Sequence, residues 1–466
     1  MGTTEKKKFR LPDAWVLLFF LAVIFAIFTY IIPAGEYVRV EDAATGRMVV
    51  DPESFHYIES TPVGFFQFFE AIFEAFSQMS DMIFFTLIIS GAFQVIRATG
   101  AIDAGIAVLA GKLHGREKLA IPLLVVVFSL FGSVMGSAEE MLPFYPIVIS
   151  LAMALGFDSV VGVAIVLCGA GAGFAGAMLN PFTIGIAHGI AGLPAFSGLG
   201  YRVIINITFV TVTAIYIYIY ASKVHKDPAK SLMYGQDMGE LSNQELKDVV
   251  FTGRHKFVLV GFVLGVLWMA YGVVKLGFYF KQLSAVFLVV GIAVGIIGGL
   301  SADKIAAAFV DGMSGMVYGA FMIGVAGTVS VVMQEGQILD TVVHALSMLI
   351  QGLPPVVSAV MMFLVQTLIN FFIPSGSGQA TVSMPIMAPL ADLIGITRQT
   401  AVLTFQFGDG LSNMIFPTVG YMMAAIALGK VKYGTWVKFM TKLFLLLSAI
   451  AAVFTAIAAL IAYGPF

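Results

Sequence analysis

Apolar runs alternate with short polar segments along almost the whole chain. The first run, residues 14–32, is long enough to cross a bilayer as a helix. Two later units differ, because a polar, glycine-rich tip separates two apolar arms that we expect to be too short to cross. The tips are FGSVMGSAEEMLPFY at 131–145 and IPSGSGQAT at 373–381. Non-helical backbone is tolerated at membrane depth only inside protein or beside a water-filled cavity, so the pattern predicts two re-entrant hairpins, 119–156 and 354–395.

The other apolar runs predict nine crossings. These are residues 14–32, 81–97, 160–187, 201–221, 257–275, 283–300, 313–333, 399–427 and 436–462. Two crossings are interrupted, by GAGAGFAGAMLNP at 169–181 and by QFGDGLSNMIFP at 406–417. Amphipathic helices are expected at 65–80, 101–113, 302–311 and 337–350, and the first of them is typical of a helix that lies in the membrane interface.

The basic residues set the predicted orientation. Lys6, Lys7, Lys8 and Arg10 directly precede the first crossing, which places the N-terminus in the cytoplasm. On this topology most of the 25 Lys and Arg residues fall on the cytoplasmic side, and the C-terminus lies outside.

The two halves of the chain resemble each other. PIVISLAMALG at 146–156 aligns without a gap with PIMAPLADLIG at 385–395, and the same offset places Gly169 on Gly408 and Gly171 on Gly410. One extra crossing between the halves would invert the second half relative to the first. Inverted repeats with paired broken helices are typical of secondary transporters whose site lies near the midplane.

The predicted fold is therefore an all-α polytopic membrane protein with two inverted repeats. The first repeat is 1–222, with hairpin 119–156 and broken helix 158–187. A cytoplasmic linker and a connecting helix occupy 223–282. The second repeat is 283–466, with hairpin 354–395 and broken helix 398–427.

Composition supports a membrane protein, and the motifs show no enzyme signature. Hydrophobic residues make up 59% and charged residues 11% of the chain, whereas soluble proteins carry about 25% charged residues. The single cysteine, Cys168, excludes an intramolecular disulfide and is expected to be a small packing residue. No HExxH, cysteine cluster, P-loop or Ser-His-Asp arrangement is present, so we expect no enzyme and no certain metal site.

The first hairpin and the first break supply acidic and amide candidates. Ser137 and Glu140 fit a capping box, which is one interpretation of Glu140; the other places it in the site. Glu139 has no capping role and is the better candidate for a substrate amine, a proton or Na⁺. Asn180 before Pro181 fits a helix start, and Asn180 and Thr183 would still present polar groups to a cavity.

The second hairpin and the second break supply hydroxyl groups and one more carboxylate. Ser375, Ser377, Gln379 and Thr381 resemble a cradle for an anion, although a flexible polar turn outside the membrane is an alternative. Asp409 either caps the second half of the broken helix or contacts a cation.

Together these segments give two sets of candidates. Substrate contacts are expected from Ser137, Glu139, Glu140, Asn180, Thr183, Ser375, Ser377, Gln379, Thr381, Asp409, Asn413 and Thr418. Coupling-ion contacts are expected from Ser133, Glu139, Gly171, Gly376, Asp409 and Ser412. No cofactor is expected, and the coupling ion is left open between Na⁺ and H⁺.

The charges near the tips favour a cationic substrate. The four segments contain three carboxylates and no Lys or Arg. Two like charges about 4 Å apart repel by roughly 4 kcal/mol at an effective dielectric near 20, so a dianion would be badly placed there. We predict exchange of amino acids of the arginine or ornithine type. The alternative is a Na⁺- or H⁺-coupled carrier of C4-dicarboxylates or other organic anions; a more remote one is an ion channel, which would need a continuous polar pore.

The order of elements and three motifs resemble a known group of carriers. The motifs are GSVMGSAEEMLPFYPI, IPSGSGQATVSMPIMAPLADLIG and QFGDGLSNMIFPT. They resemble the YfcC-like group, which belongs with DcuC-type carriers and basic amino acid antiporters in the ion-transporter superfamily. The resemblance implies a homodimer in the bacterial inner membrane, a scaffold domain, and a transport domain that holds both hairpins and moves like an elevator. The Ser-Asn-Thr tips of the Na⁺/dicarboxylate members are absent, which argues against dicarboxylate chemistry and Na⁺ sites. The expected partners are a small-molecule substrate, the lipid bilayer and a second copy of the chain, with no nucleic acid.

Overall fold

The computed structural model describes residues 14–41, 48–112, 115–136, 138–236, 251–276, 278, 280–350 and 352–464. Within these residues, seven helices are long and apolar enough to cross a membrane: Ser80–Ala98, Glu117–Val134, Leu199–Lys226, Phe280–Ile297, Ala302–Glu335, Pro355–Phe372 and Tyr433–Leu460. Trp15–Phe28 and Ser159–Ala175 are shorter apolar helices. The prediction of a helical, multi-pass membrane protein is therefore confirmed.

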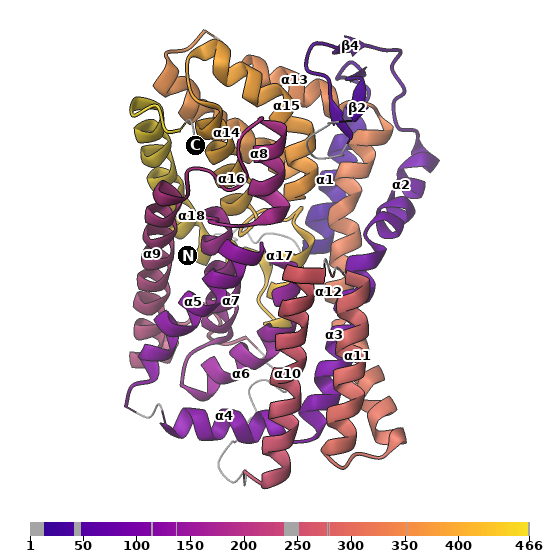
Figure 1. The fold of residues 1–466 in the computed structure, drawn as a ribbon. Coiled ribbons are helices and arrows are strands. Elements are labelled where there is room, and N and C mark those ends of the chain that lie inside the picture. Colours follow the sequence, from indigo (N-terminus) through magenta and orange to yellow (C-terminus); the bar gives the residue numbers. More distant parts are fainter. Residues whose placement is uncertain are drawn as a thin grey trace, which may run out of the picture.

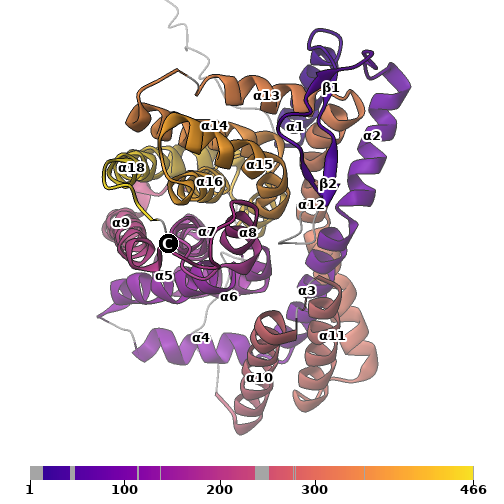
Figure 2. The ribbon, with the colours of Figure 1, turned by 45° about the horizontal axis from the view of Figure 1, so that its top comes forward.

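One group of helices is built around a single long helix, α12. We call it the α12 group; it contains α1 (Ala14–Phe28), α2 (Phe65–Gln78), α3 (Ser80–Ala98), α10 (Gly253–Leu276), α11 (Phe280–Ile297) and α12 (Ala302–Glu335). Figures 1 and 2 show it on the right. The separate amphipathic helix predicted at 302–311 was wrong, because α12 is one helix of 34 residues. The helix continues through Gly312, whose lack of a side chain leaves room for the Ser90 carbonyl of α3.

The amphipathic helix predicted at 65–80 is present as α2, and its position in the membrane interface stays a prediction. The helices α2 and α3 follow one another along α12, with Phe76 against Gly324 at one level and Ser90 against Gly312 at another. The packing on α12 accounts for the buried face of this amphipathic helix. Its buried residues, Phe68, Ala71 and Ala75, belong to the side that packs on α12.

A second group holds both hairpins and both broken helices, and we call it the hairpin group. Its first half contains α5 (Ala120–Leu130), η2 (Phe131–Met135), η3 (Glu139–Phe144), α6 (Tyr145–Ala154), α7 (Ser159–Ala175), η4 (Pro181–Gly185), α8 (Ile186–Ile190) and α9 (Leu199–Lys226). Its second half contains α14 (Pro355–Phe372), α15 (Gly376–Ile394), α16 (Arg398–Ser412), α17 (Gly420–Leu428) and α18 (Tyr433–Leu460). Both halves pack into one bundle on the left of Figure 2.

Two short helices connect the groups at opposite ends of the molecule (Figure 1). Helix α4 (Ala101–Lys112) contacts α3 and α6, and α13 (Leu339–Met348) contacts α12 and α14. Both were predicted, at 101–113 and 337–350. The 3₁₀ turns η1 (Glu117–Leu119) and η5 (Pro228–Lys230) complete the described helical segments. Residues 237–250 of the predicted cytoplasmic linker, and the basic N-terminal residues, lie outside the described part of the chain.

The two halves of the hairpin group share local features at matching positions. Gly156 and Gly395 each end a hairpin with a positive φ, of 81° and 75°. Two residues later, Asp158 and Thr397 each cap the following helix by accepting a hydrogen bond from a backbone N–H three residues on. A left-handed residue after a helix favours glycine, which explains why both positions hold it. The assignment of 1–222 and 283–466 as inverted repeats stays a prediction.

The loop between α1 and α2 contains short strands, so the purely helical prediction was wrong there. Strand β1 (Gly35–Glu36) pairs with β4 (His56–Tyr57), and β2 (Arg39–Glu41) pairs with β3 (Met48–Val50), both antiparallel. Asp340 of α13 anchors this loop, since its carboxylate accepts hydrogen bonds from the Tyr37 backbone N–H at 3.1 Å and from Arg39 at 3.0 Å. Valine and tyrosine are good strand formers. Sheets of two short strands are only marginally stable alone, and the hydrogen bonds to Asp340 stabilise this loop.

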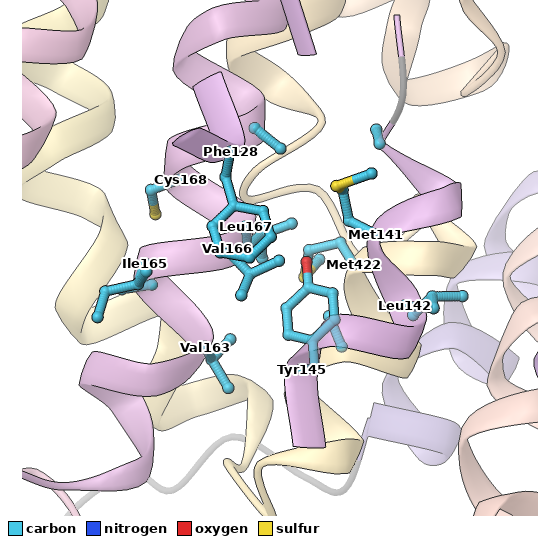
Figure 3. Close-up of a cluster of buried hydrophobic side chains, with 14 of the residues drawn as sticks. Phe128, Met141, Leu142, Tyr145, Val163, Ile165, Val166, Leu167, Cys168 and Met422 are labelled. Atoms are coloured by element: carbon cyan, nitrogen blue, oxygen red, sulfur yellow. The ribbon is translucent and has the colours of Figure 1, made fainter. Parts of the chain in front are cut away.

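The first hairpin is held against α7 by a buried apolar core. Figure 3 shows Tyr145 of α6 directed toward Phe128 and Leu167, with Cys168 nearby. Cys168 is fully buried, and its Sγ lies 3.7 Å from the Met440 Sδ of α18, so its predicted packing role is confirmed. Glycines allow α5 and α7 to approach closely, because a Cβ at Gly173 would overlap the Ser129 carbonyl.

Asp158 should be a major contributor to the stability of the hairpin group. Its carboxylate caps α7 through the Val161 N–H and accepts hydrogen bonds from the hydroxyls of Tyr220 and Ser231, both at 2.6 Å. We expect Asp158→Ala to cost about 3 kcal/mol, from one lost cap and two donors left without an acceptor. Thermal unfolding in detergent measures this. Asp227→Ala is the matched control, because Asp227 caps the exposed turn η5; equal losses in the two variants would contradict the assignment.

Candidate functional site

The four predicted segments converge on one cavity of about 340 Å³. It lies in the size range of small-molecule sites. The described residues that line it come from both hairpin tips and both breaks, from α17 and from the α10–α11 connection. They are Gly136, Ala138, Glu139, Glu140, Phe174, Phe182, Thr183, Phe278, Pro374, Ser375, Gly376, Ser377, Asn413 and Tyr421. Segments more than 200 residues apart in the sequence thus meet at one cavity.

The tip of the first hairpin is shorter than predicted. Helix α5 continues as the π-helix η2, so the first arm is the 18-residue helix Glu117–Val134 and is not too short to cross. The chain turns at Gly136, which has φ 68° and packs directly against the Asn180 side chain. The next helix, η3, begins at Glu139 with Ala138 at the N-cap and no side-chain cap. The predicted capping box was wrong, because Ala138 is the N-cap and Glu140 is the second residue of η3. Ser137 lies outside the described residues.

Both glutamates of this tip line the cavity. Glu139 is half-buried, and Glu140 is 7% exposed. No Lys or Arg is among the described lining residues. A carboxylate placed in such a site favours a cation or a proton as its partner.

The first break is confined to residues 176–180, because α7 continues to Ala175. The glycines predicted to break it at 169, 171 and 173 are therefore helical. Asn180 caps η4 as predicted, with its Oδ1 accepting from the backbone N–H of Phe182 at 2.9 Å and of Thr183 at 3.2 Å. The open carbonyls at the end of α7 have partners from other helices: Asn206 donates to Gly176 at 3.1 Å and Gln406 donates to Phe174 at 2.7 Å.

The tip of the second hairpin brings the N-terminus of α15 to the cavity. Ser375 is its N-cap, and Ser375, Gly376 and Ser377 line the cavity. The other two cradle candidates do not. Gln379 is fully buried and donates to the side chain of Gln366 at 2.8 Å, whereas the Thr381 hydroxyl donates to the Gly378 carbonyl within its own helix.

The second break begins later than predicted, at Asn413. Helix α16 continues through Ser412, so Asp409 lies in its last turn and does not cap α17, which begins after Val419. Asp409 Oδ1 accepts a hydrogen bond from Asn413 Nδ2 at 2.8 Å. Its Oδ2 has no hydrogen-bond partner among the described residues and faces Gly376. A carboxylate at the negative end of a helix dipole favours a proton or a cation nearby.

The remaining candidates are buried but do not line the cavity. The Ser133 carbonyl accepts from the N–H groups of Met178 and Leu179, both at 3.0 Å, and so connects tip and break. Gly171 lies inside α7 against Met414, and the Ser412 hydroxyl donates to the Gly408 carbonyl. Thr418 is buried, and its hydroxyl has no partner in the described part of the chain. Among the described residues no cluster of three His, Cys, Asp or Glu could hold a metal ion.

The structure adds lining residues that the sequence did not indicate. Four of them are aromatic: Phe174, Phe182, Phe278 and Tyr421. Aromatic residues are so common in this chain that none of them stands out by position. Tyr421 is the exception in hindsight, since it directly follows the second break.

Two known proteins are similar to this chain over nearly its whole length. The chain is 33% identical to a protein of Escherichia coli named "Putative basic amino acid antiporter YfcC", over 93% of this chain and 94% of the relative. It is 28% identical to an uncharacterized protein of Haemophilus influenzae, over 94% of this chain and 95% of the relative.

Two solved transporter structures are less similar to this chain than these two relatives are. They are the YdaH transporter of Alcanivorax borkumensis (15% identity, TM-score 0.42, 96% of this chain and 98% of that chain) and MtrF of Neisseria gonorrhoeae (16% identity, TM-score 0.43, 97% and 96%). This likeness is too weak to support an argument about the chain.

The family comparison covers nearly the whole chain. The DcuC family, described as "C4-dicarboxylate anaerobic carrier", matches residues 11–460. Members of this family are transporters, which agrees with the absence of enzyme motifs. The chain belongs to the DcuC family of membrane carriers.

Proposed function

We propose that this protein exchanges basic amino acids of the arginine or ornithine type across the bacterial inner membrane. The observation that carries the proposal is the charge of the cavity: its described lining contains Glu139 and Glu140 and no Lys or Arg. Asp409 lies directly behind Gly376 and adds a third acidic group. The name of the Escherichia coli relative refers to the same substrate class.

The serine residues in the lining support a zwitterionic substrate. Ser375, the N-cap, is followed by Gly376 and Ser377 at the start of the 19-residue helix α15, whose positive dipole end favours an anion. A substrate with both a carboxylate and a cationic side chain would satisfy this helix end and the glutamates. The aromatic residues of the lining would further favour a cation.

The arrangement of helices supports an elevator mechanism. The cavity is lined almost entirely by the hairpin group, which would be the transport domain, and the α12 group would be the scaffold. The groups meet where α17 packs on α12, with Gly420 against Ile323. The short helices α4 and α13 would then be the connections that let one group move against the other. Inverted repeats, a cytoplasmic N-terminus and a homodimer belong to this proposal.

A second candidate is a carrier of C4-dicarboxylates, as the description of the family states. In that case the serines and the N-terminus of α15 would bind the anion, and the carboxylates would bind coupling cations. The repulsion between a dianion and the two glutamates of the lining makes this candidate the less favourable one.

Exchange in proteoliposomes separates the two candidates. Vesicles loaded with arginine should take up labelled arginine or ornithine, and labelled succinate should not enter. The assay is run with and without a Na⁺ gradient and a pH gradient to identify the coupling ion. Succinate uptake without arginine counterflow would reject the proposed substrate.

A further inference from the structure

Asn370, a buried asparagine on α14, was not among the site residues predicted from the sequence. It is fully buried, two residues before the end of α14. Its Nδ2 donates to the Ser412 hydroxyl at 2.7 Å and to the Asn413 Oδ1 at 2.8 Å, and lies 3.3 Å from the Asp409 carbonyl. All three acceptors belong to the end of α16, where the helix breaks. One carboxamide thus contacts two side-chain acceptors and one backbone carbonyl at the end of α16.

The hydrogen bond to Asn413 fixes the orientation of that side chain. Because the Oδ1 of Asn413 accepts from Asn370, its Nδ2 faces Asp409 and donates to the carboxylate at 2.8 Å. A rotated Asn413 would place its NH₂ group against the NH₂ group of Asn370 and its oxygen against the carboxylate. Both contacts are unfavourable, so Asn370 selects the orientation in which Asn413 supports Asp409.

We infer that Asn370 is a positioning residue of the transport site, which acts on the cavity through Asn413. This inference rests on the proposed function. Asn413 lines the cavity, whereas Asn370 and Asp409 do not, so Asn413 is the group through which the other two reach a substrate. Without Asn370 the Asn413 carboxamide is free to rotate, and the one hydrogen bond that the structure shows for the Asp409 side chain is no longer enforced.

A double-mutant cycle tests this relation. Asn370→Ala is expected to raise KM about tenfold, equivalent to about 1.4 kcal/mol, with Vmax nearly unchanged. Asn413→Ala should have an effect at least as large, and the double variant should be no worse than Asn413→Ala alone. Effects that multiply in the double variant would overturn the inference, because a merely structural asparagine would act independently of Asn413.

Two controls keep the result interpretable. Thr367→Val changes a residue one turn earlier on α14 whose hydroxyl bonds only within its own helix, and it should leave KM unchanged. If Asn370→Ala does not yield folded protein by size-exclusion chromatography, Asn370→Ser replaces it, since a serine hydroxyl is too short to reach Asn413. The cycle is run with labelled arginine and labelled succinate in parallel. Transport of succinate alone would reject the proposed substrate, while the cycle on succinate would still decide the role of Asn370.

Discussion

Replacing Glu139 by glutamine is expected to lower arginine exchange about a hundredfold. Glu139 is half-buried, begins η3 and lines the cavity, so its carboxylate is available to a substrate cation. Glutamine keeps the size and removes the charge, which costs a charged hydrogen bond worth about 2–3 kcal/mol, or roughly a factor of 100 in affinity. Initial rates in proteoliposomes over a range of arginine concentrations measure the loss.

Two comparisons show whether the loss belongs to this position. Glu335→Gln makes the same chemical change at the end of α12, outside the residues that line the cavity, and should leave exchange unchanged. Glu140→Gln tests the neighbouring carboxylate, which also lines the cavity. Full transport with unchanged pH dependence in Glu139→Gln would show that the functional carboxylate lies elsewhere.

Adding one methyl group at Gly376 is expected to lower transport at least tenfold. A Cβ there would lie 2.5 Å from Thr183 Cγ2 and 2.7 Å from Asp409 Oδ2, closer than real Cβ contacts allow. The start of α15 would have to move away from η4 and α16, which displaces Ser375 and Ser377 in the cavity. Overpacking of this kind costs about 1–3 kcal/mol. Transport rate and thermal stability are measured on the same preparation.

Gly315→Ala is the matched control for this substitution. Gly315 lies inside α12, and nothing is within 4 Å of its added Cβ. Alanine is the better helix former, so this variant should be as stable as the wild type or slightly more stable. Normal transport by Gly376→Ala would mean that the close approach of Gly376 to Asp409 is not needed for function.

Much of this protein could be predicted from the pattern of its sequence. Long apolar runs had to become helices because backbone in lipid must satisfy its own hydrogen bonds. Polar and glycine-rich residues between apolar runs indicated both hairpin tips and the Asn180 cap. That the hairpins are re-entrant stays a prediction, whereas their arms Glu117–Val134 and Pro355–Phe372, which were expected to be too short, are long enough to cross. The pairing of the hairpins and breaks indicated a shared site, and the structure brings residues of all four segments to one cavity.

The apolar pattern and the motifs were therefore sufficient to identify the membrane class, most of the helices, and the acidic and hydroxyl chemistry at the tips. The ends of the helices depend on packing between segments that are distant in the sequence. Gly169, Gly171 and Gly173 resemble a break in the sequence, but neighbouring helices pack against them and keep α7 helical to Ala175. Asp409 lies in the last turn of α16, and Asn370 meets it from α14 through contacts across the bundle. Glycine and polar residues are ambiguous locally, because they serve close packing, capping and ligand contact equally well, and only the neighbours brought by folding select among these roles.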